Sequence, residues 1–141
     1  MGALNADEER ILFANDAFYA AFASGDVEAM DEVWAWEVPV VCIHPGATPI
    51  HDRAEIMRSW DHILSDPGVS DMKMHSPRVI AYDEFAFVTC YETLGGGVLI
   101  ALNGFILENG TWRMISHQAG PCPDAPDEDD ADDDEVGPSL H

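Results

Sequence analysis

The hydrophobic pattern of this 141-residue chain changes its period at about residue 70. Before that point, apolar residues recur at steps of three and four, which is the spacing of amphipathic helices. After it, apolar runs follow one another with short turn sequences between them, as in consecutive strands. Helices followed by an antiparallel meander indicate an α+β fold.

Three helices are expected in the first half of the chain. The first covers residues 7–24 and can end at Gly25, because glycine adopts the left-handed conformation there without strain. Asp26 then suits the N-cap of a second, shorter helix that runs to about Trp34. A third helix follows Asp52, which has a Glu three residues later in the spacing of a capping box.

Five strands are expected. The first is the β-branched run at residues 38–44, and Pro39 places it at a sheet edge or at the start of a strand, because proline cannot donate to a ladder. Asn109-Gly110 lies between two apolar runs, which is a strong hairpin signal. The meander is predicted at residues 72–82, 85–94, 98–107 and 111–118.

Strand alternation sorts the side chains of the meander by face, since residues two apart point the same way. In the last strand it predicts that His117 shares a face with Arg113 and Ile115, opposite Trp112 and Met114.

Both faces of the meander are largely apolar. A sheet covered by helices on one side only would show a polar second face. We therefore expect a homodimer that forms through the second face of the sheet.

The net charge of the chain limits the kinds of molecule that it can bind. Six Lys and Arg face 27 Asp and Glu, for a formal net charge of −21. A surface this acidic repels phosphate, which argues against nucleic acid and anionic membranes as partners. No apolar run approaches the roughly 20 residues that span a bilayer, and no secretory signal is visible. The three cysteines are odd in number and widely spaced, so we expect a reduced, cytoplasmic protein.

The composition shifts sharply near the C-terminus. Residues 123–141 contain a dense run of Asp and Glu that repel one another and bury nothing, so we expect a disordered acidic tail. Residues 1–122 are expected to form one domain.

Four polar residues lie in the apolar strands: His44, Glu92, Asn103 and His117. Burying an unpaired polar group is unfavourable, so each should be hydrogen-bonded, open to a cavity, or functional. A histidine can act as a general acid or base near neutral pH, and Asn103 could hold a substrate carbonyl or orient a water. The alternative is that all four are hydrogen-bonded structural residues.

Tryptophan and histidine residues are further candidates for a binding site. Trp34 and Trp60 could wall a pocket for an apolar ligand, and core packing is the alternative. The histidines do not pair at the spacing of metal ligands on one element. We therefore expect no metal site and no cofactor.

The order and spacing of several short sequences over residues 7–121 resemble the SnoaL-like branch of the nuclear transport factor 2-like superfamily. The matching pieces are the Gly25-Asp26 corner, Trp34, His44-Pro45-Gly46, Ser59-Trp60, Ala101-x-Asn103-x-Phe105, and Trp112-Arg113-Met114-Ile115 ahead of His117 and Pro121. Relatives often carry three consecutive histidines where this chain has Ser116-His117-Gln118, and this departure argues further against a multi-histidine mechanism.

The resemblance implies a cone, in which a curved, mostly antiparallel sheet packs against three N-terminal helices and encloses a pocket. It also implies dimerisation through the sheet. His44, Trp60, Asn103 and His117 would lie in or near that pocket. Strand alternation separately places Phe105 on the same strand face as Asn103. Some members rely on a carboxylate base in the pocket, for which Glu92 is the candidate here.

These observations predict a small-molecule pocket protein. His44, Asn103 and His117 are the candidate catalytic residues; the candidate substrate-binding residues are Trp34, Trp60, Glu92 and Phe105. The chemistry would be acid–base, of the isomerase, cyclase or dehydratase type, on an uncharged or weakly polar substrate. One alternative is a non-catalytic ligand-binding or protein-interaction domain. Another gives the acidic tail the active role, as a contact for a basic partner.

Overall fold

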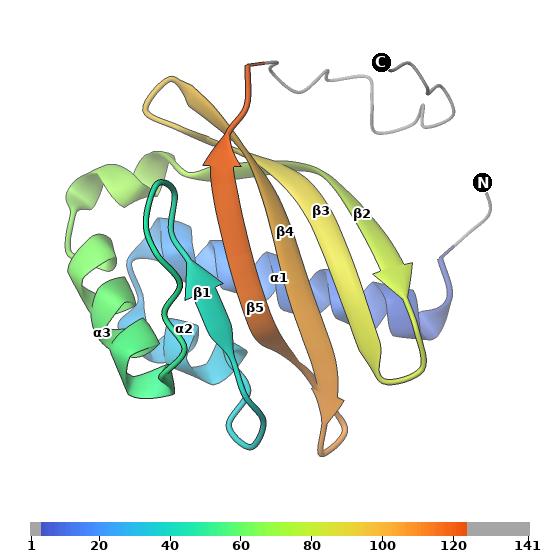
Figure 1. The fold of residues 1–141 in the computed structure, drawn as a ribbon. Helices are drawn as coiled ribbons and strands as arrows, with labels where there is room; N and C mark the ends of the chain where they lie inside the picture. Colours follow the sequence, from blue (N-terminus) through green and yellow to red (C-terminus); the bar gives the residue numbers. More distant parts are fainter. Residues whose placement is uncertain (1–3, 124–141) are drawn as a thin grey trace.

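The computed structural model describes residues 4–123. The predicted acidic tail lies outside the described residues apart from its first position. Three helices and a short 3-10 helix accompany one five-stranded sheet, which confirms the α+β prediction. Figure 1 shows the sheet curved across the helices, which all lie on one of its sides. No helix in the described part of the chain is long and apolar enough to cross a membrane.

The helices begin and end close to where the sequence predicts. Helix α1 (Ala6–Ser24) starts at a capping box that Asn5 forms with Glu8, and it ends at Gly25, whose φ of 67° is left-handed. Helix α2 (Val27–Val33) is capped by the Asp26 side chain. Helix α3 (Arg53–Leu64) is capped in the same way by Asp52, which accepts from a backbone N–H of the first turn. The 3-10 helix η1 (Pro67–Asp71) leads into the sheet.

The sheet has the strand order β1-β5-β4-β3-β2. The last four strands form the predicted meander, with bounds β2 (Lys73–Ala81), β3 (Phe85–Leu94), β4 (Gly97–Glu108) and β5 (Thr111–Pro121). Strand β1 (Val41–Ile43) lies at the edge and pairs in parallel with β5. It is shorter than the predicted run of residues 38–44, because the chain around Pro39 joins no ladder.

A β-bulge corrects the predicted facing of His117. Gly104 pairs with Ser116, but Phe105 pairs with Met114, so Ile115 is the extra residue on β5. An extra residue reverses the alternation of every side chain beyond it. His117 therefore lies on the buried face together with Met114, and not with Arg113 as predicted. The bulge needs Gly104, since a Cβ there would lie 2.5 Å from Ser116 Oγ.

The two faces of the sheet differ in what covers them. The face toward the helices carries the core, in which Phe18, Trp60 and Met114 are almost fully buried. The opposite face has no covering element in Figure 1. It nevertheless exposes large apolar side chains, with 37–48% of their surface accessible: Ile80, Phe85, Phe87, Ile100 and Leu102.

Candidate functional site

A buried polar pair joins the two central strands of the core. His117 on β5 and Asn103 on β4 face each other directly in the ladder, and His117 Nδ1 lies 2.6 Å from Asn103 Oδ1. The Asn103 amide nitrogen donates elsewhere, so its oxygen must be the acceptor from His117. His117 Nδ1 therefore carries the proton, and in the neutral ring the lone pair is on Nε2.

The pair continues across the core to a carboxyl group. Asn103 Nδ2 donates to Asn15 Oδ1 over 2.9 Å and to Tyr19 Oη over 3.2 Å, both on α1. Tyr19 Oη in turn donates to Glu92 Oε2 on β3 over 2.5 Å. All five side chains are at most 6% exposed. We call this set, His117, Asn103, Asn15, Tyr19 and Glu92, the buried polar chain.

Burial moves the pKa values at its two ends in opposite directions. Desolvation, together with a smaller effect of the nearby His44, lowers the pKa of His117 to about 3. Desolvation also raises the pKa of the Glu92 carboxyl, and the hydrogen bond from Tyr19 partly offsets this. Both shifts favour the neutral form of the group. Buried titratable groups with shifted pKa values occur both at acid–base sites and in structural networks.

His44 is the most accessible of the predicted catalytic residues. It follows β1 directly and is half-buried, and its Nε2 lies 2.8 Å from Ser59 Oγ on α3. Ser59 donates its hydroxyl proton to Ile56 O over 2.6 Å, so Nε2 of His44 must be the donor to Ser59. The lone pair is therefore on Nδ1, which has no hydrogen-bond partner among residues 4–123. Desolvation lowers the pKa of His44, which keeps the ring neutral near pH 7.

Trp60 lies between the two histidines. Its ring centroid is 4.9 Å from that of His44, edge-on, and 5.8 Å from that of His117. Phe18 also packs on His117, at 4.8 Å. The structure thus connects His44, Trp60, His117 and Asn103 through a series of direct contacts. The indole N–H of Trp60 has no partner in the described part of the chain, and neither has Nδ2 of Asn15.

Trp34 and Phe105 lie elsewhere in the core. Both are fully buried, and neither makes a ring contact with the histidines. Trp34 follows α2 and bridges to Met114 at the beginning of β5. Its position gives it a packing role.

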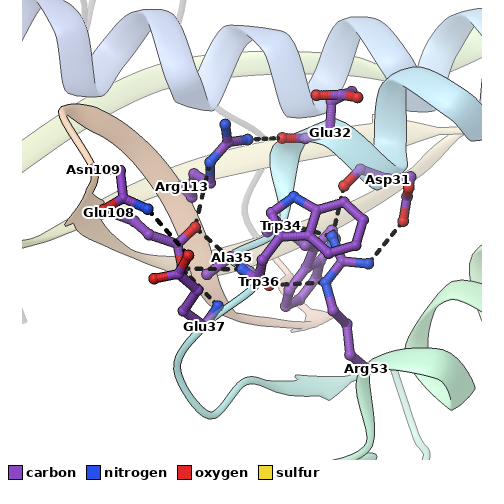
Figure 2. A network of polar contacts seen from close by, with 10 residues as sticks. All are labelled: Asp31, Glu32, Trp34, Ala35, Trp36, Glu37, Arg53, Glu108, Asn109 and Arg113. Atoms are coloured by element: carbon purple, nitrogen blue, oxygen red, sulfur yellow. Dashed lines mark hydrogen bonds and ion pairs between the residues drawn. The ribbon is translucent and has the colours of Figure 1, made fainter.

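The segment around Trp34 is fixed by two charged side chains (Figure 2). Arg53 donates to three backbone carbonyls, those of Asp31, Trp34 and Ala35, and stacks 3.5 Å above the Trp36 ring. Glu108 at the end of β4 accepts from two successive backbone N–H groups, beginning with that of Trp36. These contacts fix the connection from α2 to β1, the strand that His44 directly follows.

Sequence reasoning missed three residues of the site. Asn15 and Tyr19 are four residues apart on α1, on the stripe that faces the sheet, and Asn15 is fully buried there. A polar residue inside an apolar helical stripe was the available signal. Ser59 gave no such signal, because a serine on a helix beside Trp60 is unremarkable in sequence.

The described residues suggest no metal centre, because no three His, Cys, Asp or Glu side chains among them gather closely enough to hold an ion. The buried cysteines beside the site are weak nucleophiles as well, since desolvation raises the pKa of Cys42 to about 12 and that of Cys90 to about 11.

Solved structures resemble this fold over nearly their whole length. A Streptomyces avermitilis protein, whose name proposes a dehydratase of the NTF2-like family, is 28% identical with a TM-score of 0.73, and the match covers 82% of this chain and 96% of that one. A Thiobacillus denitrificans protein, named as a proposed association domain of calcium/calmodulin-dependent protein kinase type II, is 30% identical with a TM-score of 0.66 and coverages of 77% and 92%. An Erwinia carotovora ketosteroid isomerase-like protein, at 18% identity, TM-score 0.69 and coverages of 86% and 100%, shares the fold.

A curated relative is similar as well. The F-box protein SKIP8 of Arabidopsis thaliana is 26% identical over 111 residues, which are 77% of this chain and 48% of that protein. The chain thus spans about half the length of this relative. The family model described as "SnoaL-like domain" matches residues 11–123. The chain therefore belongs to the SnoaL-like domain family of the NTF2-like superfamily.

Proposed function

We propose that this domain binds an uncharged or weakly polar small molecule beside His44 and Trp60 and carries out acid–base chemistry on it. The reaction type would be that of an isomerase, cyclase or dehydratase. The observation that carries the proposal is the oriented, neutral His44. Ser59 fixes its ring, its Nδ1 lone pair has no partner among residues 4–123, and its half-buried position leaves it accessible.

In this proposal His44 is the catalytic base. A base whose ring is oriented by a second side chain is the arrangement that general base catalysis requires. Trp60 supplies an apolar, edge-on contact to the His44 ring.

The buried polar chain would position the site. The Asn103 amide already uses its oxygen for His117 and its nitrogen for Asn15 and Tyr19, so we assign Asn103 a positioning role in place of the carbonyl-polarising one. His117, with a pKa of about 3, is too weak a base for efficient proton transfer at neutral pH. It would instead hold the Trp60 ring in place.

The experiment is hydrogen–deuterium exchange at carbon atoms next to a carbonyl. Ketones and β-hydroxyketones of increasing apolar size are incubated with the protein in deuterated water, and exchange is followed by NMR. We expect catalysed exchange with at least one compound, loss of most of the rate in His44→Gln, and a partial loss in Ser59→Ala. His62→Gln is the matched control, because His62 is an exposed histidine on α3, the helix that carries Ser59. Exchange that is no faster than in buffer, or that persists in His44→Gln, would contradict the proposal.

A non-catalytic binding or interaction domain is the second candidate. The observation in its favour is that the buried polar chain is inaccessible to solvent: Asn103 is fully buried, and His117 is 2% exposed. The similarity to a protein named as a kinase association domain points the same way. Absence of exchange with every compound, together with unchanged ligand binding in His44→Gln, would support this candidate.

We also propose that two copies of the domain associate through the uncovered face of the sheet. The exposed Phe85, Phe87, Ile100 and Leu102 side chains support this, since apolar residues gathered on one face mark an interaction surface.

A further inference from the structure

A groove of about 470 Å³ lies away from the buried polar chain, between α1, α2 and the turn from β4 to β5. None of the five residues of that chain, and neither His44 nor Trp60, lines it. Pockets of a few hundred Å³ with a mostly apolar lining are the usual size and character for small-molecule sites.

Short side chains create the space. Ala14 and Ala17 on α1 and Ala29 on α2 line the groove, where larger residues would have filled it. At 100° per residue, Ala14 and Ala17 lie on a different flank of α1 from Asn15 and Tyr19. Phe13 beside them is 73% exposed, so a large aromatic side chain is available to cover an apolar occupant.

The charges at the groove differ from those of the rest of the chain. Two of the six basic residues, Arg10 and Arg113, line it, together with Glu32, one of 27 acidic residues. Arg113 is held by the backbone oxygen of Glu32 (Figure 2) and by Glu108. These contacts use Nη1 and Nε and leave Nη2 without a partner among residues 4–123. Arg10 pairs with Asp7 in an exposed ion pair, which contributes little and is easily exchanged.

We propose that this groove binds an apolar molecule that carries a single carboxylate. The alanines and Phe13 receive the apolar body, and the guanidinium groups of Arg10 and Arg113 hold the carboxylate, for which the planar guanidinium is well suited. A cationic ligand is disfavoured by both arginines. A multiply charged anion is disfavoured by the net charge of −21. Trp112 lines the groove, and its buried indole N–H has no hydrogen-bond partner in the described part of the chain, so the resonance of this group can report on an occupant of the groove.

The test uses the full chain and decanoate below its micelle concentration, followed by the indole N–H resonances in ¹H–¹⁵N NMR spectra. The chain has four tryptophans, and Trp112 lines the groove. We expect saturable shifts of the Trp112 resonance. We also expect 1-decanol, which lacks the charge, to bind at least about tenfold more weakly, because a charge-assisted hydrogen bond contributes about 1.5–3 kcal/mol.

Three variants locate the site. Ala17→Phe should fill the groove and abolish decanoate binding, whereas Ala20→Phe, at an exposed position of the same helix, should leave it unchanged. Arg10→Gln should weaken the binding of decanoate and leave the binding of 1-decanol unchanged. Equal affinity for decanoate and decanol, decanoate binding that survives in Ala17→Phe, or absence of saturable shifts would each overturn the proposal. None of these outcomes depends on the chemistry proposed for His44.

Discussion

His117 donates from Nδ1 to the side-chain oxygen of Asn103 over 2.6 Å, inside a core where both side chains are almost completely buried. The two residues are cross-strand partners on β5 and β4. Asn103 also donates from Nδ2 to Asn15 on α1, and this second hydrogen bond ties the sheet to the helix that covers it.

Replacement of Asn103 by leucine should destabilise the domain by about 2–3 kcal/mol, because the His117 Nδ1–H is then left buried without an acceptor. Urea denaturation monitored by circular dichroism measures the change. Gln118→Leu is the matched control, since Gln118 is an exposed amide on the neighbouring strand, and it should change stability little. Equal effects of the two substitutions would show that the hydrogen bond is unimportant.

The stability should depend on pH through His117. Its folded-state pKa is about 3, against an ordinary value of 6.5, so the unfolded state binds one more proton between these values. The stability that the neutral ring contributes is present above about pH 6.5 and is lost as the pH falls toward 3. The slope for one proton is at most about 1.4 kcal/mol per pH unit.

Urea denaturation of wild type and His117→Gln at several pH values between 7 and 4 measures this slope. The other titratable groups nearby are His44 and Cys42, which lie beside His117, and Tyr19, Glu92 and Cys90, which are joined to it through Asn103; all remain in the variant. The wild type should therefore lose stability faster than His117→Gln on acidification. His62→Gln should behave as wild type. Parallel curves for wild type and His117→Gln would refute the assignment.

Arg53→Lys should destabilise the domain by about 2 kcal/mol, since lysine cannot replace the planar donors that reach three carbonyls and also stack on Trp36. Thermal or urea denaturation provides the measurement. Arg58→Lys, on an exposed position of the same helix, is the control with the same chemical change. The prediction fails if both variants are equally stable.

Gly104→Ala should cost about 1–3 kcal/mol, because the added Cβ would lie 2.5 Å from Ser116 Oγ at the bulge. Removal of that oxygen in Ser116→Ala should restore most of the loss. A double-mutant cycle of unfolding free energies gives the coupling between the two sites. Additive effects would mean that the bulge does not depend on this close approach.

Phe87→Lys should convert a dimer into a monomer if two copies associate through the uncovered sheet face, since it places a charge among exposed apolar residues. Analytical ultracentrifugation should give twice the 15.4 kDa chain mass for the wild type and the single mass for the variant. Phe13→Lys introduces the same charge at an exposed phenylalanine on α1 and should leave the dimer intact. A monomeric wild type at micromolar concentration would contradict the proposal.

The sequence by itself determined the elements of this fold. Local signals such as Gly25, the capping aspartates and Asn109-Gly110 act within a few residues, so the helix ends and the strands of the meander follow from them. The polar residues set into apolar strands also identified most of the candidate site, because buried polar groups need partners wherever they lie.

Only the tertiary structure decided how those groups meet. The bulge opposite Gly104 moves His117 to the other face of the sheet. The sequence of β5 does not predict this bulge, because the bulge depends on contact between two strands. Tyr19 and Glu92 are 73 residues apart in the sequence, and Ser59 on α3 contacts His44 at the end of β1. Neither pairing could be predicted from local spacing. The groove beside Phe13 is likewise a space left between three elements, which exists only once they pack.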